Sequence, residues 1–128
     1  MTIAHYCIAL AIGSPYLFTT IAKFSRPGFT FEQNHNPRDW LERLEGYRKR
    51  AHFAQLNSFE VVPAFCAAVL VAQQAQVAAQ PTIDAIAIAF VVSRLLYGAC
   101  YVADWAVMRS VIWFAGMGCI AGLFGVSL

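Results

Sequence analysis

The sequence predicts an all-α membrane protein in which four spanning helices form one bundle. Hydrophobic residues make up 59% of the 128 residues and charged residues only 12%, whereas soluble domains carry about 25% charged residues. The mean hydropathy is +0.57. Four apolar runs each approach or exceed the ~20 residues that cross a bilayer. The chain is short enough for a single domain.

The charge distribution gives the expected orientation of this bundle. Net charge is +2, which does not indicate a nucleic-acid partner, but seven of the nine basic residues fall within 23–50. The positive-inside rule therefore places that segment in the cytoplasm and both termini outside. The four cysteines are isolated in apolar runs, without metal-binding spacing, so we interpret them as buried hydrophobes and predict no metal site.

The first predicted span covers residues 3–24, with Pro15 in its interior. A proline there is tolerated where neighbouring groups satisfy the carbonyl that it leaves free. The polar loop 25–46 follows. Within it, Pro37 favours the start of a short amphipathic helix, and Trp40 indicates that this helix lies at the membrane surface as an anchor.

The second, third and fourth predicted spans are residues 47–79, 85–105 and 110–127. Pro63 removes one backbone hydrogen bond from the second span and bends it. Pro81, between Gln80 and Thr82, indicates a tight external turn between the second and third spans.

The connection between the third and fourth spans is short and holds Asp104 and Arg109. In the fourth span, Gly118 and Gly122 have GxxxG spacing. Small residues at this spacing allow close approach of a neighbouring helix, so we predict a packing face rather than a ligand site.

The second and third spans each carry a polar face. These two faces consist of Arg50, Asn57 and Glu60, and of Arg94, Tyr97, Tyr101 and Asp104. Glu60 lies ten residues from Arg50, and Arg94 lies ten residues from Asp104. In antiparallel helices of equal rise, an Arg50–Asp104 pair therefore places Glu60 level with Arg94, and Asn57 level with Tyr97.

Two interpretations of these matched faces remain open. They form a structural ion pair that orders the bundle, or they line a polar cavity, open to the cytoplasm, that binds a small zwitterionic or anionic ligand. Gln55 points away from the face of Asn57, which suits contact with a neighbouring subunit.

The segment 50–63, RAHFAQLNSFEVVP, resembles the signature of the MAPEG family, the membrane-associated proteins in eicosanoid and glutathione metabolism. The run from Arg94 through Tyr97 to Tyr101 resembles the third-helix motif of the same family, and the loop is similar to that of bacterial members. The resemblance implies a homotrimer of four-helix subunits in the bacterial inner membrane. Many members are glutathione transferases or peroxidases that act on lipophilic electrophiles.

The resemblance also implies roles for individual residues. Positions that would bind glutathione, as a co-substrate, are Arg50, Gln55 (from the adjacent subunit), Asn57, Glu60, Arg94, Tyr97 and Tyr101. A cation would lower the pKa of the glutathione thiol, and Tyr101 would hydrogen-bond the thiolate. Arg109 is the arginine nearest the expected catalytic position, displaced by one residue; Arg50 is the other possible cation.

Two positions differ from the leukotriene-forming synthases of the family. Phe53 stands in place of an arginine, and Val61 in place of a tyrosine. Both make the expected cavity more apolar, which favours an alternative function as a non-catalytic lipid- or partner-binding protein. A small proton-coupled exporter is a third hypothesis, although such proteins usually carry their carboxylate on the first helix.

Overall fold

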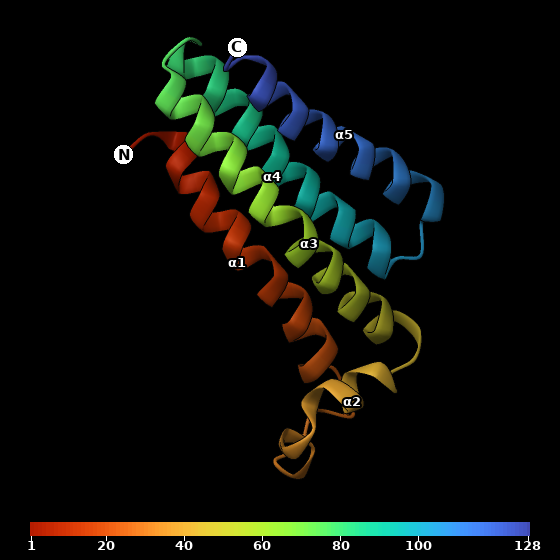
Figure 1. Cartoon of the computed structure of the whole chain (residues 1–128). Coiled ribbons are helices and arrows are strands. Elements are labelled where there is room, and N and C mark those ends of the chain that lie inside the picture. The colour runs from red at the N-terminus through yellow and green to blue at the C-terminus, as the bar shows by residue number, and fades with distance from the viewer.

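The computed structural model describes residues 1–128 as six helices and no strand (Figure 1). Their bounds are α1 Ile3–Phe24, η1 Glu32–His35, α2 Pro37–Glu42, α3 Gly46–Ala75, α4 Gln80–Val102 and α5 Ala106–Gly125. The helices α1, α3, α4 and α5 lie side by side and are long and apolar enough to cross a membrane. The predicted four-helix bundle is therefore confirmed.

The boundary between α3 and α4 differs from the predicted one. α3 ends at Ala75 instead of residue 79, because Gln76 adopts the left-handed conformation (φ 53°) that commonly closes a helix. α4 begins at Gln80 instead of residue 85. Pro81 lies in the first turn of α4, where backbone N–H groups have no acceptor within the helix, so the N–H that proline lacks is not missed. The proline therefore starts the helix and does not form the turn.

The boundary between α4 and α5 also differs, and this changes the position of Arg109. Only residues 103–105 connect the two helices, and Asp104 takes a positive φ of 63° in this turn. α5 begins at Ala106, four residues before the predicted start, so Arg109 lies within the helix and not in the link.

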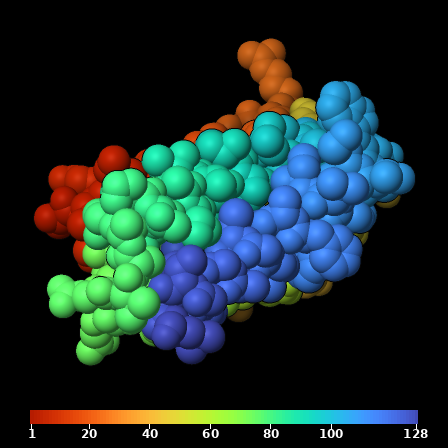
Figure 2. All heavy atoms as spheres, turned by 90° about the horizontal axis from the view of Figure 1, so that it is seen from above, coloured from red at the N-terminus to blue at the C-terminus, as the bar shows by residue number.

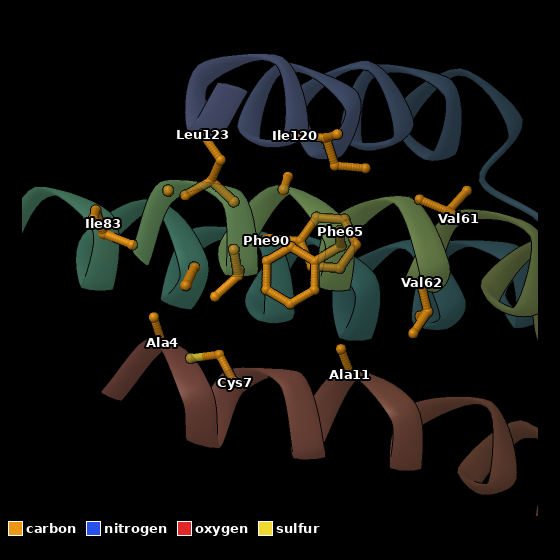
Figure 3. Packing of buried hydrophobic residues seen from close by; sticks show 14 residues of the cluster. Ala4, Cys7, Ala11, Val61, Val62, Phe65, Ile83, Phe90, Ile120 and Leu123 are labelled. Carbon is orange, nitrogen blue, oxygen red and sulfur yellow. The ribbon is translucent and has the colours of Figure 1, made fainter. Parts of the chain in front are cut away.

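An apolar core occupies the half of the bundle that contains the chain termini (Figure 3). At its centre the rings of Phe65 from α3 and Phe90 from α4 stack with centroids 3.9 Å apart. Ala11 of α1 and Leu123 of α5 pack against this pair from opposite sides. Because alanine presents so little side chain, α1 can approach α3 and α4 closely.

The proline in α1 shows how the membrane helix keeps its backbone satisfied. Pro15 has no N–H to donate to the carbonyl of Ala11, four residues earlier. The hydroxyl of Ser14 donates to that oxygen instead, at 2.9 Å, and is itself buried. The carbonyl that the proline leaves free is therefore satisfied within the helix.

The start of α1 is hydrogen-bonded to residues near the start of α4 and near the end of α3. The carboxylate of Asp84 in α4 accepts a hydrogen bond from the backbone N–H of Ala4 at 2.8 Å. A negative charge at a helix N-terminus is favourable. Gln73 of α3 donates to the hydroxyl of Thr2 at 3.2 Å. These two bonds set the depth of α1 against α3 and α4.

The apolar side chains in and just after the short helix α2 pack on the bundle, while its predicted position at the membrane surface stays a prediction. Leu41 and Leu44 are buried against Ala22 of α1 and Ala51 of α3. The face predicted to anchor the chain in the membrane surface therefore packs on the protein. The segment around residues 25–35 projects from the body of the bundle, as the orange atoms in Figure 2 show.

The closest helix approaches occur at glycines other than the GxxxG pair. The ring of Phe18 in α1 occupies the space where a Cβ of Gly98 would lie, and Ser93 Oγ is 2.9 Å from the equivalent position at Gly116. Gly118 has no such neighbour within 4 Å, and Gly122 has only one, at 3.9 Å. Within the chain the GxxxG pair meets no close neighbour, and its role as a packing face for another helix stays a prediction.

We expect Ser14→Ala to lower the free energy of unfolding by about 1 kcal/mol, because the Ala11 carbonyl, to which Pro15 cannot donate, loses the hydroxyl of Ser14. Thr20→Ala is the matched control, since the Thr20 hydroxyl also donates to a backbone carbonyl, that of Tyr16, but no proline follows there. Denaturant titration in detergent micelles measures both. Equal losses in the two variants would contradict the role given to Ser14.

Gly98→Ala should destabilise the bundle by about 1–3 kcal/mol, because the new methyl group would lie 1.9 Å from Phe18 Cζ. Gly118→Ala adds the same methyl group in open space and should leave the thermal midpoint unchanged. In the double variant Gly98→Ala/Phe18→Leu, a smaller side chain replaces the Phe18 ring. This variant should recover part of the lost stability. If Gly98→Ala and Gly118→Ala have the same thermal midpoint, the contact of Phe18 with Gly98 does not stabilise the bundle.

Candidate functional site

The centre of the candidate site is the guanidinium of Arg94, which is 1% exposed in the interior of the bundle. Its Nη2 donates to Asn57 Oδ1 at 2.9 Å and to the hydroxyl of Ser58 at 3.1 Å, both on α3. The guanidinium also lies 4.2 Å from the ring centroid of Tyr97. Its Nε is buried without a hydrogen-bond partner from the protein.

The two predicted ion pairs do not form. No basic nitrogen lies within 4.0 Å of a carboxylate oxygen anywhere in the chain. Arg50 donates to the backbone carbonyl of Val102 at 3.1 Å, at the C-terminal end of α4, rather than to Asp104. Arg94 donates to Asn57 rather than to Glu60. The predicted faces therefore meet, but through an amide and a backbone carbonyl instead of two ion pairs.

Asn57 connects Arg94 to Glu60 in place of a direct ion pair. Its side-chain oxygen accepts from Arg94, and its Nδ2 donates to Glu60 Oε2 at 3.4 Å. An amide can do this because it carries both an acceptor and a donor. The Glu60 carboxylate is thus left exposed on the surface of the single chain, where it can accept hydrogen bonds from a ligand.

A groove of about 360 Å³ lies between α3 and α4 on the side of Glu60. Its lining residues are Phe53, Leu56, Asn57, Glu60, Tyr97 and Tyr101. The rings of Tyr97 and Tyr101 meet edge to face, with centroids 5.6 Å apart. The groove therefore combines one carboxylate, one amide and two phenols with an apolar wall. We call it the α3–α4 groove.

A second cavity of about 160 Å³ shares Asn57 and Tyr97 with this groove and opens toward α5. α5 contributes Arg109, Ser110, Trp113 and Phe114 to its lining. The guanidinium of Arg109 lies 4.3 Å from the ring centroid of Tyr101, an arrangement typical of a cation–π contact. Because Arg109 is part of α5, its charge faces the two tyrosines.

Three predicted site residues line neither of these cavities: Arg94, which is buried behind Asn57, and Arg50 and Gln55. Arg50 interacts with the end of α4, where a cation is favourable, and lines neither cavity. Gln55 lines a separate cavity between α1, α2 and α3, and its Oε1 is buried without a hydrogen-bond partner from the protein. Within one chain, Gln55 therefore does not face the α3–α4 groove.

Sequence reasoning missed the role of Ser58, which is completely buried and bonds Arg94. Its spacing of eight residues from Arg50 could have placed it on the polar face. The cavity residues Ser110, Trp113 and Phe114 were missed because the fourth span, which contains them, was interpreted as a packing helix and given no part in the site. Val61, predicted to make the cavity more apolar, is buried in the core and does not line the groove.

The electrostatics of the site favour an anionic ligand with one cationic group. Two arginines, Arg94 and Arg109, lie beside the shared wall of Asn57 and Tyr97, and neither is neutralised by a carboxylate within 4.0 Å. Glu60 is the only carboxylate in the groove lining. Charges in a low-dielectric environment are costly unless paired, so a ligand that brings negative charge toward the arginines is stabilised.

The fold and the site define a class: a four-helix membrane protein with a polar groove set among apolar helices. Comparison with known families identifies the member of that class, because the sequence model of the MAPEG family matches residues 3–128. The chain belongs to the MAPEG family and is an integral membrane protein of this glutathione and eicosanoid metabolism group. No curated protein and no solved structure matched the chain.

Replacing Asn57 with leucine should lower the free energy of unfolding by about 2–3 kcal/mol, because Arg94 loses a partner and keeps only the Ser58 hydroxyl. Glu60→Leu should change it by less than about 0.5 kcal/mol, since its side chain is exposed and receives one long hydrogen bond. Thermal unfolding without added ligand compares the two. A larger loss for Glu60→Leu would show that the carboxylate, and not the amide, stabilises Arg94.

Proposed function

We propose that the chain is a glutathione-dependent transferase or peroxidase that acts on lipophilic electrophiles within the membrane. Glutathione is the co-substrate in this proposal, and no metal is required. The observation that carries the proposal is the connection of Arg94, Asn57 and Glu60 beside two tyrosines and Arg109. Glutathione carries two carboxylates and one ammonium group. These charges are complementary to those of two arginines and one glutamate.

The groups of the α3–α4 groove suit a small peptide. Glu60 would accept hydrogen bonds from the ammonium group or a peptide N–H, and Asn57 would order the carboxylate of Glu60 for this contact. Tyr97 and Tyr101 would donate through their hydroxyls. Arg94 acts from behind Asn57, because its guanidinium is buried, so it positions the amide and contributes positive potential.

Arg109 and Tyr101 are the proposed catalytic residues. A free thiol has a pKa of about 8.5, and a nearby cation lowers the pKa because it stabilises the thiolate. Arg109 lies over the Tyr101 ring, so both groups can reach one sulfur atom. The thiol proton passes to water, and the sulfur lone pair forms a C–S bond to the electrophile. The electrons of the broken bond leave with the displaced group.

The assembly and orientation are part of the same proposal. A homotrimer would bring the Gln55 face of one chain toward the ligand of the next, as the resemblance to the family implies. With the loop 25–46 in the cytoplasm of a bacterial inner membrane, water-soluble glutathione would enter from that side. The electrophile would arrive through the lipid, next to the exposed apolar ring of Phe114.

A second function, a non-catalytic lipid- or partner-binding protein, is favoured by Phe53. This ring lines the α3–α4 groove where leukotriene-forming relatives have an arginine, and it lies 6.4 Å from the ring of Tyr101. A groove walled by Phe53 and Leu56 also suits an acyl chain. Conjugation assays that remain silent across several electrophiles, together with lipid that copurifies, would support this function.

Adding glutathione to the purified protein should produce the ultraviolet absorbance of a thiolate near neutral pH. Arg109→Gln should abolish this signal, because the cation that stabilises the thiolate is lost. Tyr101→Phe keeps the ring under Arg109 and removes only the hydroxyl, so it should weaken the signal without changing glutathione affinity more than a few-fold.

The matched control for Arg109→Gln is Arg43→Gln, which removes an exposed arginine that lies near neither site cavity. It should leave the thiolate signal intact. The proposed activation is refuted if the parent protein binds glutathione by calorimetry but shows no thiolate. If glutathione does not bind, the glutathione-dependent function itself is wrong.

A further inference from the structure

The segment 24–35, between α1 and α2, carries the two most exposed aromatic side chains of the chain. Phe31 is 90% exposed, and Phe24, the last residue of α1, is 73% exposed. We call residues 24–35 the projecting loop. In the view of Figure 2 the projecting loop (orange) leaves the bundle sideways, across its long direction. The chain itself therefore leaves both rings uncovered.

The projecting loop is held in a defined shape that directs the ring of Phe31 outward. At its base, the ring of Phe29 meets that of Trp40 edge to face, with centroids 4.9 Å apart. At its tip, the side chains of Thr30 and Gln33 each accept a hydrogen bond from the backbone N–H of the other, at 3.4 and 2.8 Å respectively. Phe31 lies within this turn. Its exposure is thus built into the loop, and an occupant would not have to order it.

The end of the bundle from which this loop projects has aromatic residues where its spanning helices begin and end. Phe24 ends α1, Tyr47 lies in the first turn of α3, and Trp105 precedes α5. All three are at least 44% exposed. Aromatic residues at the ends of spanning helices lie at the level of the lipid head groups. A loop that starts at this level and runs sideways therefore lies along the surface of the bilayer.

The charge of this part of the chain suits an anionic membrane surface. Residues 23–38 contain three basic residues and one acidic residue, a net charge of +2 with histidine neutral. Arg26 is exposed and follows Phe24 by two residues. A leaflet that contains anionic lipids attracts basic residues next to a spanning helix. Arg26 can therefore contact lipid phosphates while the aromatic rings contact hydrocarbon.

A bilayer fits the tip of the loop better than a protein partner does. Protein interfaces depend on clusters of anchor residues in packed pockets, whereas the tip presents one ring between the polar residues Thr30 and Glu32. In the three-residue turn of η1, neighbouring side chains point in different directions. The carboxylate of Glu32 can thus stay in water while the ring of Phe31 enters the lipid.

We propose that the projecting loop docks on the surface of the bilayer that holds the bundle. The ring of Phe31 inserts among the lipids just below the head groups, and Arg26 lies against the phosphates of anionic lipids. The anchor is this loop and not α2, whose Leu41 is buried within the chain. The docking does not depend on glutathione binding in the α3–α4 groove, so either proposal can fail without the other.

The experiment places trifluoromethyl-phenylalanine at position 31 or, as the matched control, at position 32, in protein reconstituted into lipid nanodiscs. Fluorine relaxation is measured with dissolved oxygen, which concentrates in lipid, and with a water-soluble nickel chelate. We expect the ratio of the oxygen effect to the nickel effect to be roughly threefold higher at position 31 than at position 32. Both positions are exposed in the chain, so neither probe should disturb folding.

The lipid composition tests the contact of Arg26. With the probe at position 31, Arg26→Gln should lower the ratio roughly twofold in discs that contain phosphatidylglycerol and leave it unchanged in discs of phosphatidylcholine alone. Arg43→Gln is the matched control, because it removes an exposed arginine beyond α2 and outside the projecting loop. It should leave the ratio unchanged in both kinds of disc.

Four results would overturn the proposal. If the probe at position 31 responds to nickel and little to oxygen, the ring lies in water, as a docking site for a soluble protein would. If it responds to neither reagent, another copy of the chain covers it. Equal ratios at positions 31 and 32 would show that the ring does not insert. An equal loss in Arg26→Gln and Arg43→Gln would show general attraction without the contact assigned to Arg26.

Discussion

The buried guanidinium of Arg94 is the constraint on which the polar half of this bundle depends. A charge placed in hydrocarbon costs at least about 2.5 kcal/mol, and the chain has no carboxylate within 4.0 Å to offset it. Neutral acceptors on α3, Asn57 and Ser58, therefore hold the guanidinium. These bonds fix how far α4 slides against α3, and with it the positions of Tyr97 and Tyr101 over the groove.

Polarity is separated along the axis of the bundle. In one half, Phe65 and Phe90 stack at the centre and small residues of α1 close around them, which leaves a dry core. In the other half the ring of Phe18 fits against Gly98, one turn from Arg94, and the groups beyond it are tyrosines and arginines. The apolar half thus supports the polar half, whose cavities reach the surface. A site for a polar ligand in a membrane requires this arrangement.

Much of this arrangement could be predicted from the sequence, because long apolar runs and helical spacing are strong signals. α1 covers the same residues as the first predicted span, and the polar faces of α3 and α4 do meet. The predicted ion pairs were wrong because direct contact was inferred from opposite charges, whereas Arg94 donates to the amide oxygen of Asn57, and Glu60 accepts from the same amide group. The helix start at Gln80 was missed because Pro81 was assigned to a turn, although it belongs to the first helical turn. The start at Ala106 was missed because Arg109 was assigned to the connection.

The second spanning helix of the bundle, α3, presents polar groups on two sides. Asn57 and Glu60 face the α3–α4 groove, and His52 and Gln55 face the cavity under α2. A membrane helix with polar groups on two sides cannot leave both sides against hydrocarbon, because unpaired polar atoms there are costly. Each side therefore needs an occupant that supplies hydrogen bonds, and the two sides differ in what they offer. The groove presents a carboxylate beside two tyrosines, which suits a peptide, whereas the cavity presents the buried, unpaired polar atoms of His52 and Gln55.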